Sequence, residues 1–435
     1  MTAEIAVFNK SAVALAADSA VTISGGGSSK IYNGAEKLFA LTKHHPVGIM
    51  VYGTGSLCSI PWELIIKEYR RKLGSRSFDT LDAYAEDFWT FLSGSTRLIH
   101  HDFRRTYLEQ IYFQAFETLT TRVEEKASTL FQSDPSHQIS FQESLSMFLA
   151  TANEMIVELE QCDYFYGFDD QDIVNELPHA LAYVERCLPE LFPAVQFEQI
   201  HRDTFSRMLS MISCRQNLLG VNTGVVIAGY GNEEYFPVVL AFNVQGFVGD
   251  KLRLAPNLSK SSAAGQSGMQ AYAQEDEVYT FTNGVNPNLL QCFNESFQGT
   301  LRSILAKHVE LIDSLGLDSA TKDSINQEFL DNMNTTWDAN VQMADSVMVR
   351  EHRDKVTQMI EFLPKDDLAY MAESLVNMTA FKRKVSNDSE TVGGPIDVAI
   401  ISKGDGFIWV KRKHYFSREL NNHYFNEFLK GDNHD

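Results

Sequence analysis

The start of the chain holds residue types that could perform nucleophilic catalysis. Met1 is followed by Thr2, and removal of the initiator methionine would leave a threonine with a free α-amine. Such an amine titrates near pH ~7.7–8.0, so part of it is unprotonated at neutral pH and able to accept the proton of its own residue's hydroxyl. One residue would then supply both nucleophile and general base. The alternative is an incidental Met-Thr start, because a short motif alone is weak evidence for function.

Two charged residues lie on segments that otherwise have the pattern of buried strands. Asp18 follows the apolar stretch Val13–Ala17, and Lys37 precedes Leu38-Phe39. A charged side chain in a sheet core is costly unless it is paired. Their joint occurrence therefore points to a functional or structural pairing, and a plain structural ion pair stays open as the alternative.

The elements that must position these residues are short strands. Alternating apolar residues predict a hairpin from Ile5 to Leu15, with its turn at Asn9-Lys10-Ser11. A second hairpin is predicted from Leu38–Leu41 and Val47–Tyr52. Between the two hairpins, the glycine- and serine-rich segment Gly25–Ser29 is expected to be a flexible loop.

Helices are expected to follow these strands. A helix over Trp62–Leu73 has a proline before it and Gly74 behind it, and helical periodicity continues to about Cys214. Because a residue before proline is pushed out of the helical region, this block is expected to break ahead of its prolines, which are Pro135, Pro178, Pro189 and Pro193.

Strands and helices then alternate once more towards the end of the chain. Strands are predicted at 223–230, 235–244, near 277–282, at 396–402 and at 407–411, with helices from 287 to 376. Runs of strands separated by runs of helices favour antiparallel sheets covered by helical layers over βαβ alternation.

Composition limits the classes of function. Among 435 residues, 37 Lys and Arg against 57 Asp and Glu give a net charge of −20, which argues against nucleic-acid and anionic-membrane partners. Five dispersed cysteines form no C-x-x-C pair, so we expect no metal site, no disulfide framework and a reducing, cytoplasmic location. The apolar stretch Ala12–Ala17 is too short for a signal sequence or a membrane span, and the mature chain is expected to begin at or next to Met1.

Four segments together resemble the start of proteasome β-type subunits, which are N-terminal-nucleophile hydrolases. Those proteins open with a strand from Thr, return through V-x-L-A-A-D-S/R, and continue through E-K-L/I-F to a glycine-rich turn. The corresponding segments here are Thr2–Val7, Val13–Ser19, Glu36–Phe39 and Tyr52–Gly55. The segment Val392–Asp397 resembles most the bacterial proteasome-like proteins such as Anbu, which also begin Met-Thr without a propeptide.

The resemblance implies a catalytic set. Thr2 Oγ would attack a carbonyl while the Thr2 amine accepts and later returns the proton. Lys37, matched by placing three extra residues in the loop Gly25–Ser29, would lie near Oγ and favour its alkoxide character, and Asp18 would keep Lys37 protonated and oriented. The Gly53 amide, matched with a two-residue insertion, would be the oxyanion donor.

Further positions follow from the same resemblance. Asp388 and Thr391 match the pair that braces the threonine amine if one residue is inserted before Gly393. Val21 and Val51 match the positions that line the specificity pocket and would make it apolar, although both also suit a plain core role. The best match to the family's serine-glycine motif is Thr282-Asn283-Gly284, which carries Asn where Ser is expected.

The resemblance also divides the chain. It is strongest over 2–57, extends over 220–255 and 365–411, and is absent from most of 75–215 and 310–360. Residues 1–74, 216–310 and 364–415 are therefore expected to form the proteasome-like core. Residues 75–215 and 311–363 are expected to be two helical insertions, and 416–435 a polar tail.

The implied fold is α+β: an αββα sandwich of two antiparallel sheets between helical layers, with added helices. The implied activity is a threonine peptidase that cleaves peptides or unfolded proteins through an acyl-enzyme on Thr2, without a cofactor. An amidase of the same fold acting on a small molecule, and a catalytically silent proteasome-like scaffold, are the alternatives. The resemblance further implies a homo-oligomer, and it leaves open whether an ATP-dependent unfoldase feeds the enzyme.

Overall fold

The computed structural model describes residues 3–25, 28–133, 138–193, 195–220, 222–385, 392–417 and 419–421. The chain divides into two compact units: unit 1 comprises Met1–Gly34, Gly265–Ile400 and Trp409–Asp435, and unit 2 comprises Ala35–Ala264 and Ile401–Ile408. The protein is α+β, and every strand pair with a defined register is antiparallel. This confirms the expected class.

The main sheet of unit 1 is built around the first hairpin. Its strand order is β12-β1-β2-β13-β14. The strands are β1 (Glu4–Phe8), β2 (Val13–Ala17), β12 (Gly268–Ala271), β13 (Asp397–Ser402) and β14 (Gly406–Lys411). The turn at Asn9 is closed by the Asn9 N–H, which donates to Ala12 O at 3.0 Å, so the predicted hairpin is confirmed.

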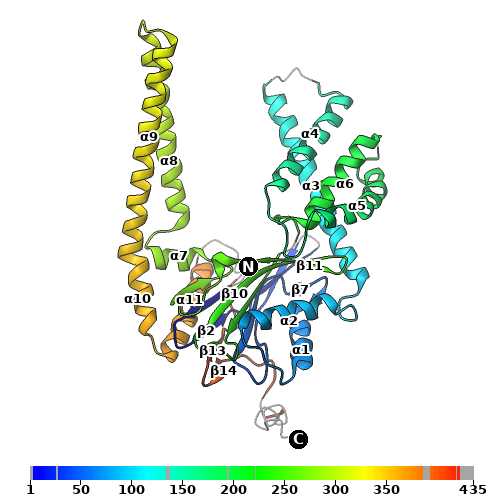
Figure 1. The fold of residues 1–435 in the computed structure, drawn as a ribbon, viewed down its shortest axis with the longest axis vertical. Helices are drawn as coiled ribbons and strands as arrows, with labels where there is room; N and C mark the ends of the chain where they lie inside the picture. The colour runs from blue at the N-terminus through cyan, green and yellow to red at the C-terminus, as the bar shows by residue number, and fades with distance from the viewer. Residues whose placement is uncertain are drawn as a thin grey trace. The chain divides into compact units, whose positions relative to one another are not determined.

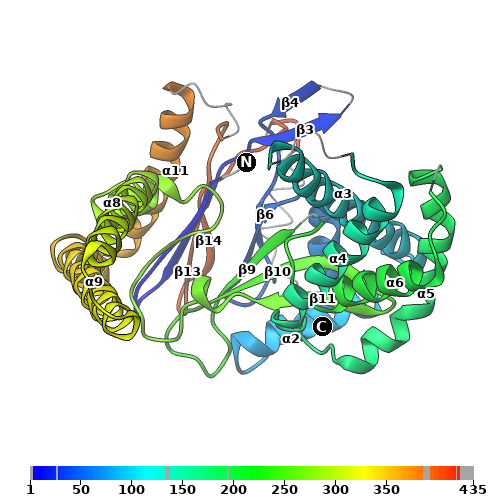
Figure 2. The same ribbon diagram turned by 90° about the horizontal axis from the view of Figure 1, so that it is seen from above.

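One face of this sheet packs against helices α10 (Asp354–Phe362) and α11 (Lys365–Val385). Figure 2 shows α11 running beside the sheet. Ala14 and Ala16 of β2 are fully buried, and their small side chains let α11 approach closely. Helix α11 packs against the sheet through buried residues at helical spacing, which include Leu368, Ala372, Leu375, Val376 and Thr379.

Unit 1 also carries two long helices, α8 (Pro287–Ser314) and α9 (Ser319–Met348), which lie side by side in Figure 1. A five-residue π-helical turn, η2 (Val349–Arg353), joins α9 to α10. The start of α8 is fixed by Pro287 at its first position and by Asn286, whose Oδ1 accepts the N–H of Asn288 at 2.9 Å.

The strand expected near 277–282 is wrong, because these residues form helix α7 (Asp276–Asn283). The β-branched and aromatic residues of this segment favour a strand locally. Tertiary context overrides that preference, since Val278 is buried in the unit 1 core and Gly284 ends the helix with φ +72°.

The flexible loop expected at Gly25–Ser29 is also wrong as a whole. Val21–Gly25 (β3) and Ser28–Tyr32 (β4) pair as an antiparallel hairpin, while Gly26 and Gly27 lie outside the described residues. Glycine is depleted in strands, and glycine and serine are both common in turns, so the composition of this segment predicted a loop.

Unit 2 contains the second sheet, with strand order β11-β10-β9-β6-β5. Its strands are β5 (Leu38–Ala40), β6 (Val47–Gly53), β9 (Thr223–Gly229), β10 (Val238–Val248) and β11 (Lys251–Pro256). The β5–β6 hairpin predicted from the sequence is confirmed, with Leu41 N–H donating to Val47 O at 2.9 Å. Unit 2 also contains a small hairpin, formed by β7 (Ser56–Leu57) and β8 (Ile60–Pro61), and a short helix, η1 (Leu258–Lys260).

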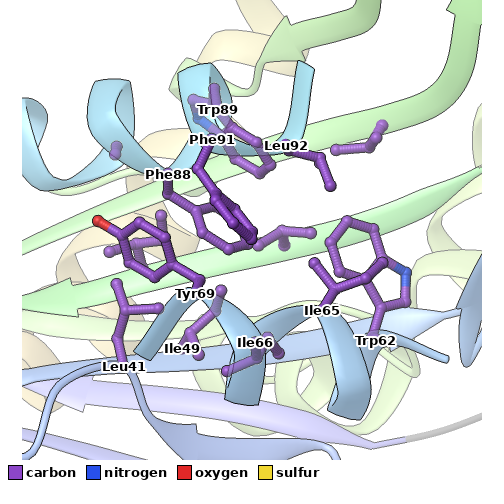
Figure 3. Packing of buried hydrophobic residues seen from close by; sticks show 14 of the residues in the cluster. Leu41, Ile49, Trp62, Ile65, Ile66, Tyr69, Phe88, Trp89, Phe91 and Leu92 are labelled. Carbon is purple, nitrogen blue, oxygen red and sulfur yellow. The ribbon is translucent and has the colours of Figure 1, made fainter. Parts of the chain in front are cut away.

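Helices α1 (Trp62–Leu73) and α2 (Leu81–Gly94) cover one face of this sheet. Figure 3 shows Trp62, Ile65 and Tyr69 of α1 meeting Phe88 of α2 and Ile49 of β6 in one apolar cluster. The Tyr69 and Phe88 rings pack edge to face at 4.9 Å, a favoured aromatic geometry.

Four further helices of unit 2 form a group with its own core. They are α3 (His101–Ser133), α4 (Phe141–Glu160), α5 (Asp170–Leu191) and α6 (Gln199–Cys214), grouped in Figure 2. The breaks expected before Pro178 and Pro189 are wrong, because both prolines lie inside α5. Packing compensates for the lost backbone bonds, since Ala180, Val184 and Leu188 are buried in this core.

Each sheet is buried on its other face as well. On β2, Val13, Leu15 and Ala17 alternate with the helix-facing alanines and are at most 1% exposed. In unit 2, Met50 and Val226 face away from the α1–α2 cluster and are fully buried. The central strands of the two sheets thus lack the solvated face common in antiparallel sheets, whereas Ile408 and Val410 of the edge strand β14 are exposed. Among the described residues, no helix combines the length and apolarity that a membrane span requires.

Candidate active site

Asp18 is the buried centre of the predicted site within unit 1. It follows β2 directly and is 1% exposed. In the β1–β2 register Glu4 pairs with Ala17, so Ala3 comes next to Asp18. The Asp18 N–H donates to Ala3 O at 3.1 Å, and the Ala3 N–H donates to Asp18 Oδ1 at 3.1 Å. Asp18 thus holds the backbone of the residue that follows Thr2 in the sequence.

The second oxygen of Asp18 ties in two further segments. Oδ2 accepts the N–H of Gly393 at 2.9 Å and the N–H of Ala20 at 3.3 Å. A buried carboxylate needs such donors, because its desolvation is costly otherwise. Three segments distant in sequence therefore converge on one carboxylate: the start of β1, the turn after β2, and residues 392–395.

Ser19 strengthens the link to the segment around Gly393. Its N–H donates to Gly393 O at 3.2 Å, and its hydroxyl donates to Pro395 O. Gly394 has φ +76°, and a Cβ there would lie 2.8 Å from the Asn33 Cβ, so this tight passage requires glycine. No role for Ser19 was evident from the sequence, although this residue lies in the segment that carries the resemblance.

Thr2, Asp388 and Thr391 lie outside the described residues. The described residues next to Thr2 and Thr391 in sequence are Ala3 and Val392, which are 1% and 5% exposed. Both neighbours belong to the unit 1 core.

Lys37 belongs to unit 2 and is 7% exposed, which is rare for lysine. It precedes β5, and its carbonyl accepts the Val51 N–H at 2.9 Å, continuing the β5–β6 ladder by one position. A buried lysine in a sheet requires compensation for its desolvation. The structure thus places Lys37 in a protein interior, as the sequence pattern indicated.

Gly53 ends β6 and is exposed there. It has φ +84°, and a Cβ would lie 2.7 Å from Asn222 O, so only glycine fits. Next to it, the hydroxyls of Thr54 and Thr223 lie 2.6 Å apart, and the Trp62 indole N–H donates to Thr223 Oγ1 at 3.4 Å. These hydroxyls were not singled out from the sequence, since single threonines carry no spacing signal.

The two predicted specificity positions differ from each other. Val51 is 5% exposed and packs in the α1–α2 cluster with Ile49 and Trp62, which is the core role left open for it. Val21 starts β3, pairs with Tyr32 and is half-buried. Val21 alone therefore offers side-chain surface.

Asn283, which stands where the family's serine-glycine motif has serine, has a structural role. Asn283 is 5% exposed, and its Oδ1 accepts from Arg353 Nη2 at 2.8 Å and from Arg353 Nε at 3.0 Å. Its side-chain amide donates to Tyr279 O at 3.1 Å. Asn283 joins α7 to η2.

The cysteines offer no competing nucleophile among the buried thiols. All five are free, and burial raises the pKa of Cys58 and of Cys214 to about 12. A thiol with such a pKa carries almost no thiolate at neutral pH. Within the described residues, no group of three or more His, Cys, Asp or Glu side chains is arranged to hold a metal ion.

No protein-family model matches the chain, and no curated protein matches it either.

Proposed function

We propose that the protein is a proteasome-like threonine peptidase, in which Thr2 becomes the N-terminal residue and attacks the carbonyl of a peptide bond. One observation carries the proposal: the buried Asp18 carboxylate binds the backbone of Ala3 and of Gly393. An aspartate that only solubilised a turn would not be 1% exposed.

The proposed fold is an αββα sandwich. Such a sandwich needs two antiparallel sheets, each with a helical layer on one face and a second face that is also buried. The α11-covered sheet of unit 1 and the α1–α2-covered sheet of unit 2 both have these properties. Long helices are then additions to the sandwich.

In the proposed reaction, Thr2 Oγ forms a bond to the substrate carbonyl carbon, and the Thr2 amine takes the hydroxyl proton. The tetrahedral oxyanion is stabilised by the Gly53 N–H, and collapse breaks the C–N bond while the proton passes to the leaving amine. Water then hydrolyses the acyl-enzyme ester. Lys37 supplies positive charge near Oγ, and Asp18 is a positioning residue that fixes the backbone next to the nucleophile.

The test of this function uses Thr2→Ala with Thr129→Ala, an exposed threonine of α3, as the matched control. Intact-mass spectrometry should show loss of Met1 and addition of one threonine-directed covalent inhibitor to the parent protein and to the control. Cleavage of fluorogenic peptides should fall by about 10³-fold or more in Thr2→Ala, because the hydroxyl nucleophile is lost while the α-amine remains.

Retention of Met1, or equal turnover by Thr2→Ala, would remove the mechanism. Inhibitor labelling without cleavage of any peptide would redirect the substrate class to small amides. Absence of both labelling and cleavage would favour the alternative that the protein is a catalytically silent scaffold.

A further inference from the structure

A cavity of about 270 Å³ lies in the helical group of unit 2, between the first turns of α3, the middle of α5 and the end of β10. None of the site residues predicted from the sequence lines it. Its lining alternates charged groups with aromatic and aliphatic ones, which is the composition of a small-ligand site.

Glu176 of α5 forms the buried polar part of this cavity, with a side chain that is 8% exposed. Its Oε1 accepts the Tyr112 hydroxyl at 2.8 Å, and that hydroxyl lies 2.8 Å from Ser213 Oγ. Its Oε2 has no hydrogen-bond donor among the described residues: the closest ionisable nitrogen is His179 Nδ1 at 3.8 Å. One oxygen of this largely buried carboxylate thus has no donor among the described residues.

The arginines near the cavity are each paired with a carboxylate other than Glu176. Glu109 Oε1 pairs with Arg105 Nε at 3.3 Å, and Glu109 Oε2 pairs with Arg186 Nη2 at 2.7 Å. Arg104 Nη1 pairs with Asp250 Oδ1 at 3.2 Å. Within the described part of the chain, Glu176 has no lysine or arginine nitrogen within 4.0 Å. Burial raises the pKa of Glu176, as expected for a carboxylate that lacks a full cationic partner.

We propose that this cavity binds a small primary amine with an apolar body, whose ammonium group donates to Glu176 Oε2 while the body contacts Leu108 and Tyr183. A charge-assisted N–H···O bond gives Oε2 the donor it lacks. A water occupies about 30 Å³ in the liquid, so the cavity holds roughly nine non-hydrogen atoms. This inference stands apart from the proposed peptidase activity, because it uses none of its residues.

The probe we propose is 2-phenylethylamine, which has the required charge and size, compared with the neutral 2-phenylethanol and the anionic 3-phenylpropionate. Ligand-observed saturation-transfer NMR on the full chain should show binding of the amine in the millimolar range or tighter. Glu176→Gln should weaken the amine at least tenfold, because glutamine keeps the shape and the Tyr112 bond but removes the charge. Glu185→Gln, an exposed change on the same helix, should leave binding unchanged.

Equal binding of the amine to Glu176→Gln, or binding of 3-phenylpropionate as tight as that of the amine, would overturn the assignment. Circular dichroism of Glu176→Gln establishes that its fold is intact, so a loss of binding reports on the charge. Thr2→Ala should bind the amine normally, which separates this site from the peptidase proposal.

Discussion

The two long helical regions of the chain, α3–α6 and α8–α9, bury themselves to very different degrees. In α3–α6, aromatic and aliphatic residues from all four helices share one core, with Phe116 of α3 packed against Phe205 of α6 at 5.6 Å. Along α8 and α9, both fully described, Ile312 is the only buried residue. Four helices can surround a common hydrophobic core. Two helices contact each other along one line only, so their remaining apolar residues stay exposed to solvent.

The consequence for α8–α9 is an open apolar groove of about 1280 Å³, which also reaches Tyr279 of α7. Phe293 and Phe297 line it and remain 52% and 57% exposed. Helices of this kind draw little stability from tertiary packing, which normally supplies most of it. Helices α8 and α9, with 28 and 30 residues, are longer than α4, α5 and α6 but bury far less, so helical length says little about independent stability.

The two regions should differ most in the free energy of unfolding that is lost when one phenylalanine of each region is truncated to alanine. Phe116→Ala should lower the free energy of unfolding by about 3–5 kcal/mol, because it removes a buried ring and leaves a cavity. Phe293→Ala should change it by less than about 0.5 kcal/mol, since that ring is half in solvent already. Urea unfolding followed by circular dichroism measures both variants.

Similar losses in the two variants would contradict the comparison. In particular, a loss above about 2 kcal/mol for Phe293→Ala, appearing only at high protein concentration, would mean that the groove is covered by association.

The sequence predicted those elements whose signals are local. The sequence periodicity and turn residues predicted both hairpins, the first with its turn at Asn9, and helix α1 between Pro61 and Gly74. The β3–β4 pairing, helix α7 and the uninterrupted α5 depended on packing with distant segments, which no local pattern records.

The site shows the same division between local and distant information. Asp18 and Lys37 stood out because a charge on an apolar strand is conspicuous, and both are buried. The bond between Asp18 and Gly393 spans 375 positions, so sequence spacing could not reveal it. Val51 could not be separated from an ordinary core residue by type alone, and it packs in the core.

Amide hydrogen-exchange rates should also differ between the two helical regions, and this difference is expected to be smaller than the difference in unfolding free energy. Amides in the middle of α9 should exchange at least tenfold faster than those in the middle of α6, because the latter lie beneath a shared core. Mass spectrometry of peptic fragments after timed exchange measures both regions in one sample. Equal protection in α6 and α9 would show that α9 is held by packing that the single chain does not provide.

The smallest expected effect concerns the titratable group that α3–α6 buries. Burial raises the folded-state pKa of Glu176, with Tyr112 and Arg105 facing it from α3 and His179 from α5. Below the unfolded glutamate pKa of about 4.3, both states are protonated, so the group does not reduce stability. As the pH rises from there through the raised folded pKa, ionisation of this largely buried carboxyl group destabilises the fold.

Glu176→Gln has no such titration, so its stability relative to the parent protein should increase as the pH rises from 4 towards 8. Urea midpoints across this range measure the difference, and Glu185→Gln on the exposed side of α5 should show no trend. His179→Asn in the same series isolates the neighbouring histidine, whose charge acts to lower the pKa of Glu176 and so opposes the effect of burial. The prediction would be contradicted if the difference in stability between Glu176→Gln and the parent protein were constant with pH or fell as the pH rises. The Tyr112 hydroxyl alone would then compensate for burial of the Glu176 carboxylate. Burying this charge in α3–α6 would in that case cost no more stability than exposing a charge on α8–α9.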